Sequence, residues 1–439
     1  MTRIVLATSG SFGDLHPYLA VGLGLRARGH EVTLATAESY RAKVTSEGLA
    51  FHAMRPDIVP MASPLEVIRR TFDPFSGANF LIKELVIPYV EDTYCDLLDA
   101  CRGADLLVSH PTLFPAPLVA EKLQLNWLSA VLSPGVFVSA YDPPLLPPIP
   151  WAHALRHFGP LPYQLLVPMM KAATKSWMRP IAEIRRREGL RPARCALHDD
   201  MFSPYGTLAF FSSVLGAVQP DWPAKSRITG FPIYDSKSPG QHLDPRMDAF
   251  LNAGPPPVVF TLGSSAVVDA GDFFEQSLAA VRRLGGRAVF LVGDSYQAPM
   301  TLSDENVIIA AYAPYSELFP RAAAIVHQGG IGTTGHALRA GVPSLVVPLG
   351  LDQPDNAFRA QRLGVARVEP RRRYNAAAAA RHLHALLDSP EYRAAAQRIG
   401  KQVRSEDGVA AACDAIQEAL ALRASERKSK TAPVAVRVA

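Results

Sequence analysis

The sequence of 439 residues contains no apolar run of the ~18 residues that a membrane-spanning helix requires. Cysteine is scarce, and none of its 4 positions forms a CxxC pair or lies beside a histidine cluster. A zinc site or a disulfide framework is therefore not expected. The apolar run near the N-terminus, residues 4–7, is too short for the core of a signal peptide, so we expect a cytoplasmic protein.

Charged residues make up only 19% of the sequence, and 45 basic against 40 acidic side chains give a net charge of +5. The basic residues are scattered, apart from Arg371–Arg373 and a short stretch within 427–430. Nucleic-acid binders carry clustered basic residues with interleaved aromatics, so a nucleic-acid partner is excluded. At 48% hydrophobic residues, the chain has material for two or three domains of ~150 residues, and general disorder is excluded.

Short apolar runs alternate with helical segments in both halves of the sequence. They are residues 4–7, 32–35, 106–108 and 128–132 in the first half, and 258–262, 288–292, 307–310, 324–326 and 344–347 in the second. Strands that alternate with helices predict parallel sheets of the doubly wound α/β class. We expect an N-terminal Rossmann-like domain over residues 1–232, a C-terminal one over 241–424, and a disordered tail over 425–439.

An insertion of different character interrupts the first half between about residues 140 and 205. Residues 141–180 contain nine prolines, with Trp151 and Trp177 among them. Helix interiors do not tolerate proline, because it removes a backbone donor and clashes with the preceding turn. The insertion is therefore predicted to be irregular and apolar, within the N-terminal domain.

A glycine-rich loop, His327–Thr334, follows the strand predicted at 324–326. Glycines let the backbone approach a ligand closely, and the amides at a helix N-terminus favour an anion such as phosphate. The next strand, 345–347, is followed by Asp352 and Gln353. Ligands of open α/β sheets bind beyond the carboxyl ends of the strands, so both segments converge on one crevice. Together they predict a site for phosphate and sugar.

Residues 312–356 resemble the donor-binding signature of family 1, UDP-glycosyltransferase-type enzymes. The signature elements are Tyr312 with Pro314, His327 with Gly329 and Gly330, Gly341-Val342-Pro343, and Asp352-Gln353. The resemblance implies the GT-B fold, in which two Rossmann-like domains face each other across a cleft and the last helix packs back on the N-terminal domain. It also implies a nucleotide sugar as co-substrate, no other cofactor, and metal-independent inversion.

The resemblance also implies roles for single residues. Tyr312 would stack under the nucleobase, Ser264 would add a phosphate contact, and the diphosphate would be held by His327 with the amides of Gly329, Gly330, Gly332 and Thr333. Asp352 and Gln353 would bind hydroxyls of the donor sugar. One position departs from the pattern, because plant members carry a ribose-binding Glu where this sequence has Gly335. A dTDP-sugar is therefore at least as plausible a donor as a UDP-sugar.

The acceptor side depends on the segment Ser9–Pro17, which follows the first predicted strand. Glycosyl transfer needs a base for the incoming hydroxyl, and a carboxylate at the tip of this strand suits that role. Asp14 is our candidate, and bacterial antibiotic, sterol and rhamnolipid enzymes share its Gly-Asp-x-x-Pro pattern. The structural alternative is that Asp14 only caps the following helix. His16 is the second candidate base.

Aromatic residues are the candidates for binding an apolar acceptor, and the alternative is that they fill the core of the N-terminal domain. The candidates are Phe12, Phe75, Phe80 and Trp151. Blocks at 132–134, 219–223, 229–232 and 327–332 resemble the rhamnosyltransferases of rhamnolipid synthesis. This resemblance implies transfer of rhamnose from dTDP-L-rhamnose to a hydroxyalkanoyloxyalkanoate lipid, and it leaves peripheral contact with a membrane open.

Two other functions stay open. One is a UDP-glucose-dependent enzyme that acts on a sterol, a phenolic compound or a macrolide. The other is a non-catalytic protein that binds nucleotide sugars. A dinucleotide-dependent oxidoreductase is disfavoured, because Gly10-x-x-Gly13 after the first strand lacks the full GxGxxG pattern.

Overall fold

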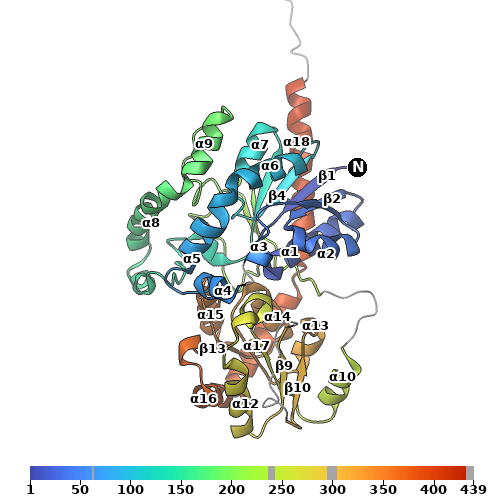
Figure 1. Cartoon of the computed structure of the whole chain (residues 1–439), viewed down its shortest axis with the longest axis vertical. Coiled ribbons are helices and arrows are strands. Elements are labelled where there is room, and N and C mark those ends of the chain that lie inside the picture. Colours follow the sequence, from blue (N-terminus) through green and yellow to red (C-terminus); the bar gives the residue numbers. More distant parts are fainter. Residues whose placement is uncertain (62–63, 236–242, 294–303, 432–439) are drawn as a thin grey trace, which may run out of the picture.

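The computed structural model describes residues 1–61, 64–235, 243–293 and 304–431. It contains two parallel β-sheets, and Figure 1 shows the N-terminal one above the C-terminal one. The strand order is β3-β2-β1-β4-β5-β6-β7 in the first sheet and β10-β9-β8-β11-β12-β13 in the second. Helices cover both sheets, so the predicted α/β class with two Rossmann-like domains is confirmed.

The strands coincide closely with the predicted apolar runs. The first sheet consists of β1 (Arg3–Ala7), β2 (Glu31–Thr36), β3 (Ala50–Ala53), β4 (Leu106–Ser109), β5 (Asn126–Val131), β6 (Thr207–Ala209) and β7 (Ser226–Ile228). The second consists of β8 (Val258–Thr261), β9 (Ala288–Leu291), β10 (Val307–Ala310), β11 (Ala324–His327), β12 (Ser344–Val346) and β13 (Ala366–Val368). Alternate residues of β1 enter two different cores, Ile4 and Leu6 on one face and Val5 and Ala7 on the other, which requires a continuous apolar run.

Helices connect the strands. In the N-terminal domain they are α1 (Phe12–Ala27), α2 (Arg41–Ser46), α3 (Ile58–Met61), α4 (Leu65–Thr71), α5 (Gly77–Phe80), α6 (Val90–Ala100), α7 (Ala116–Lys122), α8 (Leu161–Thr174) and α9 (Arg179–Arg187). In the C-terminal half they are α10 (Pro245–Asn252), α11 (Gly263–Ala266), α12 (Phe273–Arg283), α13 (Tyr315–Leu318), α14 (Ile331–Ala340), α15 (Gln353–Arg362), α16 (Ala376–Asp388), α17 (Pro390–Arg404) and α18 (Gly408–Thr431).

The insertion at 140–205 is largely helical, so the prediction of an irregular segment is wrong. It contains a 3-10 helix, Pro150–Phe158, followed by α8 and α9. Prolines occupy the first turns of all three helices, where a missing backbone N–H costs nothing, and Pro168 alone lies inside α8. The number of prolines alone therefore does not predict an irregular segment. Whether a proline breaks a helix depends on its position relative to the start of that helix.

The last helix, α18, returns to the N-terminal domain and packs against α1, as the red helix at the top of Figure 1 shows. The Cys413 thiol lies 3.7 Å from the Val21 carbonyl, and Arg28 donates to Asp414 over 2.6 Å. The helix continues to Thr431, whereas disorder was predicted from residue 425. Once a helix is nucleated, adding residues requires no further nucleation, which explains the extension. Residues 432–439 lie outside the described part.

The two domains meet at the carboxyl ends of their first strands. Helix α1, which follows β1, contacts α11, which follows β8. The predicted linker near 231–240 is described only as far as residue 235. Within the described ranges, none of the helices is long and apolar enough to cross a bilayer.

Candidate active site

Asp14 is the third residue of α1, and its side chain takes part in a capping box. Its Oδ2 atom accepts hydrogen bonds from the Ser11 backbone N–H at 2.7 Å and from the Ser11 hydroxyl at 3.1 Å. Gly10 has φ +134°, and a Cβ atom there would collide with this carboxylate. Oδ2 of Asp14 therefore caps the helix, as the structural alternative expects, while Oδ1 faces the side chain of His110.

His110 follows β4 directly and was missed by the sequence analysis. Its Nε2 atom lies 4.0 Å from Asp14 Oδ1. The Thr112 backbone N–H lies 3.3 Å from Nδ1 and the Thr112 hydroxyl 2.6 Å from it, so Thr112 holds the ring with Nε2 toward Asp14. Burial lowers the pKa of His110, and the Asp14 charge acts in the opposite direction. Because β4 pairs with β1 in parallel, a polar residue just after it was the available signal.

His16, the second candidate base, points elsewhere. Its ring packs 5.2 Å from Phe12 and 4.9 Å from Tyr234, a residue just before the undescribed part of the linker. Burial, with the nearby Lys43 charge, lowers the pKa of His16 to about 4. Within the described residues its Nε2 atom has no hydrogen-bond partner. The His16 ring is thus packed among aromatic side chains, whereas Oδ1 of Asp14 faces His110.

On the C-terminal side, His327 ends β11 and is almost fully buried. Burial lowers its pKa to about 3, so the ring is neutral at physiological pH. The Gly329 backbone N–H donates to Nδ1 over 3.1 Å, which leaves the proton on Nε2. Gly329 has φ +91°, and a Cβ there would lie 2.9 Å from Val346, so the close approach to β12 requires glycine.

Helix α14 begins beyond this loop with Gly330 as its N-cap, without a side-chain cap for its first amides. Gly332 and Thr333 lie in that first turn, and a Cβ atom at Gly332 would meet nothing within 4 Å. The predicted glycine loop and helix start therefore leave backbone N–H groups beside open space. Unsatisfied amides at a helix N-terminus favour an anion.

Asp352 and Gln353 stand at the N-terminus of α15, after Leu351, whose φ is +58°. Burial raises the pKa of Asp352 to about 6. The hydrogen bond from the Asn356 amide at 2.8 Å lowers this pKa, and the negative charge of Asp14 raises it further. Since the Asp14 charge acts on Asp352, the two carboxylates, one from each domain, lie near each other. Gln353 is buried, and its Oε1 atom accepts from the Leu349 N–H over 2.9 Å.

Asn356 is a second residue that the sequence analysis missed. Besides Asp352, its Nδ2 atom donates to the Gly329 carbonyl over 3.0 Å, which joins the glycine loop to α15. Ser264 is exposed in α11, at the end of β8. Tyr312 is 54% exposed beyond β10, with its ring 6.4 Å from that of Tyr315.

The four aromatic candidates for the acceptor do not share one environment. Phe12 is partly exposed on α1 and lies 5.1 Å from the Tyr40 ring. Phe75 and Trp151 are exposed, Trp151 at 62%. Phe80 is buried under the Arg70 guanidinium, 3.9 Å from its ring centre, which favours the core-filling interpretation for this residue. Within the described residues, no cluster of three or more metal-ligating side chains occurs.

Two Rossmann-like domains that meet at the carboxyl ends of their first strands define a protein of the GT-B class, and comparisons with known proteins agree. The glycosyltransferase family 28 N-terminal domain matches residues 4–141. The C-terminal domain described as erythromycin biosynthesis protein CIII-like matches residues 275–418. O-mycaminosyltylonolide 6-deoxyallosyltransferase of Streptomyces fradiae is 34% identical over 429 residues, covering 95% of this chain and 97% of the relative. The chain therefore belongs to the family of GT-B glycosyltransferases that use nucleotide sugars and that includes this relative.

Other relatives are similar over most of the chain. Glycosyltransferase GtfE of Amycolatopsis orientalis is 31% identical, covering 94% of this chain and 96% of the relative. A sterol 3-beta-glucosyltransferase of Aspergillus terreus is 27% identical over 94% of this chain but only 30% of its own length. The calicheamicin glycosyltransferase CalG4 shares the fold, with a TM-score of 0.70, 17% identity, and coverage of 99% of this chain and 100% of CalG4. These relatives do not confirm the predicted resemblance to rhamnolipid enzymes.

Proposed function

We propose that the protein transfers a sugar from a nucleoside diphosphate donor to a hydroxyl group of an apolar acceptor, with inversion and without a metal ion. Asp14 takes the proton of the acceptor hydroxyl, and the oxygen attacks the anomeric carbon as its bond to the diphosphate breaks. The observation that supports this most is that α1, which carries Asp14, meets the C-terminal domain at α11, near enough for the Asp14 charge to act on Asp352. An acceptor base and a donor-sugar ligand have to meet in this way.

The leaving diphosphate needs its developing charge stabilised. The first-turn amides of α14, at Gly332 and Thr333, are suited to this because no side chain caps them. His327 would donate from Nε2 as a neutral imidazole, since Nδ1 already accepts from Gly329. On this proposal Tyr312 and Ser264 bind the nucleobase and a phosphate, and Asp352 and Gln353 bind the sugar.

For the donor, we favour a dTDP-sugar. The resemblance predicts a ribose-binding carboxylate at the position of Gly335. A Cβ atom there would lie 2.9 Å from the ring of Phe231, so this position has no room for a longer side chain. A donor that lacks the 2′-hydroxyl loses nothing at such a site. Of the dTDP-sugars, dTDP-L-rhamnose is our first candidate.

For the acceptor, two candidates follow from different observations. A hydroxyalkanoyloxyalkanoate lipid follows from the sequence blocks shared with rhamnolipid enzymes. A macrolide is favoured by the relative from Streptomyces fradiae, whose name denotes 6-deoxyallosyl transfer to O-mycaminosyltylonolide. Both present a hydroxyl group on a large apolar body.

The test is turnover with dTDP-L-rhamnose and UDP-glucose, each combined with a macrolide aglycone and with a hydroxyalkanoyl lipid, followed by mass spectrometry of the products. We expect a rhamnosylated product with at least one acceptor. Efficient use of UDP-glucose without turnover of dTDP-L-rhamnose would overturn the proposed donor. Binding of nucleotide sugars without transfer to any acceptor would instead favour the non-catalytic alternative.

A further inference from the structure

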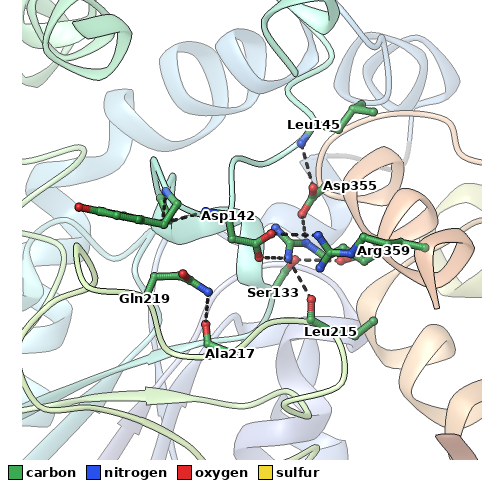
Figure 2. Close-up of polar contacts among 12 residues, drawn as sticks. Ser133, Asp142, Leu145, Leu215, Ala217, Gln219, Asp355 and Arg359 are labelled. Atoms are coloured by element: carbon green, nitrogen blue, oxygen red, sulfur yellow. Dashed lines mark hydrogen bonds and ion pairs between the residues drawn. The ribbon is translucent and has the colours of Figure 1, made fainter. Parts of the chain in front are cut away.

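A buried cation in the middle of α15 joins the two domains. The Arg359 side chain is only 2% exposed. Its Nε atom donates to Asp355 over 2.7 Å, one turn earlier in the same helix. Its Nη1 atom donates to the Leu215 carbonyl over 2.9 Å and to the Asp142 carboxylate, both in the N-terminal domain. Figure 2 shows the guanidinium of Arg359 between the carboxylates of Asp142 and Asp355.

Neighbouring residues of α15 reinforce this junction. The second oxygen of Asp355 accepts from the backbone N–H of Leu145 over 2.8 Å, and Leu145 lies at the start of the insertion (Figure 2). The Ser133 hydroxyl donates to Asn356 Oδ1 over 2.9 Å. Two successive residues of a C-terminal helix therefore hold groups of the N-terminal domain, both from the segment that follows β5.

The same helix presents Asp352 and Gln353 to the crevice at its N-terminus. Asn356 uses its oxygen to accept from Ser133 and its amide to donate to Asp352. A continuous chain of hydrogen bonds and helix backbone thus runs from the N-terminal domain to Asp352. A shift of α15 along its own axis would therefore move the side chains of Asp352 and Gln353.

The Arg359 charge can be buried only because its partners compensate for the lost hydration. Asp142 is the partner that comes from the acceptor domain, and the rim pair with Arg362 at 3.2 Å adds a second contact to the same carboxylate. If Asp142 is removed, Arg359 keeps Asp355 and the Leu215 carbonyl, so its charge remains paired. The expected consequence is a shift of α15, not unfolding.

We propose that Asp142 is a positioning residue for the donor sugar. Through Arg359 it fixes α15, and with it Asp352 and Gln353, so that the acceptor domain controls how the sugar is held. This inference rests on the proposed sugar-binding role of those two residues. It does not extend to the nucleotide part of the donor, which would be bound by other elements, α14 and the loop after β10.

The experiment compares Asp142→Ala with Asp221→Ala. Asp221 anchors the start of the same insertion, because it accepts from the Ser139 hydroxyl and the Ala140 N–H, both at 2.6 Å. Within the described residues, no hydrogen bond or ion pair joins Asp221 directly to α15. Asp221→Ala loosens the insertion, including the bond from the Asp142 N–H to the Ser139 hydroxyl at 3.3 Å, but it leaves the Asp142 carboxylate available to Arg359.

The donor is the nucleotide sugar that the wild-type protein turns over. We expect Asp142→Ala to raise the donor KM about tenfold, because the variant loses one charge-assisted contact. Binding of the corresponding nucleoside diphosphate without sugar, measured by calorimetry, should weaken much less, because α15 reaches the glycine loop through the Asn356 bond to the Gly329 carbonyl and not through Asp352 or Gln353. Asp142→Asn, whose amide oxygen still accepts from Arg359, should recover most of the effect. Asp221→Ala, which keeps the carboxylate that contacts Arg359, should raise the donor KM clearly less than Asp142→Ala does.

Equal effects of Asp142→Ala and Asp221→Ala on the donor KM would overturn the inference. So would an equal loss of affinity for the nucleoside diphosphate and the nucleotide sugar, because a general opening of the crevice predicts that result. If Asp142→Ala does not fold, the comparison of Asp142→Ser with Asp221→Ser decides by the same criteria, because the shorter serine side chain does not reach Arg359. Absence of turnover in the wild-type protein is a separate outcome, which contradicts the proposed function itself.

Discussion

The Nε2 atom of His110 lies 4.0 Å from Oδ1 of Asp14, although the two residues are far apart in the sequence. The contact exists because β4 lies beside β1 in the sheet, so that residues just after both strands meet at one edge. Thr112 fixes the His110 ring from the other side. The Nε2 atom of the imidazole thus faces the carboxylate oxygen that takes no part in the capping box.

This geometry predicts that His110 orients the Asp14 carboxylate during transfer. We expect His110→Ala to lower kcat about tenfold, because the carboxylate loses its second point of orientation. His110→Gln, which keeps an N–H donor at a similar distance, should retain most of the activity. The measurement is steady-state kinetics at saturating donor. An unchanged kcat in His110→Ala would show that the contact has no role in the reaction.

Asp14→Asn should lower kcat by about 10²- to 10⁴-fold, the range expected when a general base is lost. The Asn oxygen can still accept from the Ser11 N–H, so the start of α1 should remain folded. Donor affinity, measured by calorimetry, should not fall. The measurement is product formation under single-turnover conditions.

Ser11→Ala provides the matched control for this variant. It removes the hydroxyl side of the capping box and should lower the free energy of unfolding by about 1 kcal/mol. Because it leaves the carboxylate of Asp14 in place, most of the activity should remain. Wild-type activity in Asp14→Asn would mean that Asp14 only caps the helix, and His16 would become the first candidate.

The features that could be predicted from the sequence are those that depend on residues close together in the chain. Buried parallel strands such as β1 and β11 require continuous apolar runs, and a close approach such as that of Gly329 to Val346 requires glycine. Both leave a local signal. The loop His327–Thr334 and the helix start at Ile331 were found for this reason.

Contacts across the chain left no such signal. His110 gains its place from the pairing of β1 with β4, and the junction of Arg359 with Asp142 joins positions 217 residues apart. The insertion at 140–205 was mispredicted for a different reason. There the position of each proline within its helix mattered, and a count of prolines does not contain that information.

Gly335→Ala should destabilise the protein, although glycine to alanine within a helix is normally favourable. The new Cβ atom would lie 2.9–3.1 Å from three ring atoms of Phe231, so α14 or the ring has to move. We expect a loss of about 1–3 kcal/mol in the free energy of unfolding, as for overpacked cores. Gly332→Ala is the matched control in the same helix, because its Cβ atom would meet nothing within 4 Å. A gain in stability at both positions, measured by urea denaturation, would contradict the close packing against Phe231.

The pKa of Asp352, raised to about 6 chiefly by burial and partly by the Asp14 charge, predicts the pH dependence of donor binding. A carboxylate accepts stronger hydrogen bonds from sugar hydroxyls than a neutral carboxyl group does. Affinity for the nucleotide sugar should therefore rise as the pH increases through about 6, the point at which Asp352 loses its proton. Asp14→Asn removes a like charge, which favours ionisation, so the midpoint should move to lower pH. Calorimetry between pH 5 and 7.5 measures this shift, and Asp352→Asn should abolish the transition. A midpoint that stays in place in Asp14→Asn would mean that the two carboxylates do not interact across the crevice.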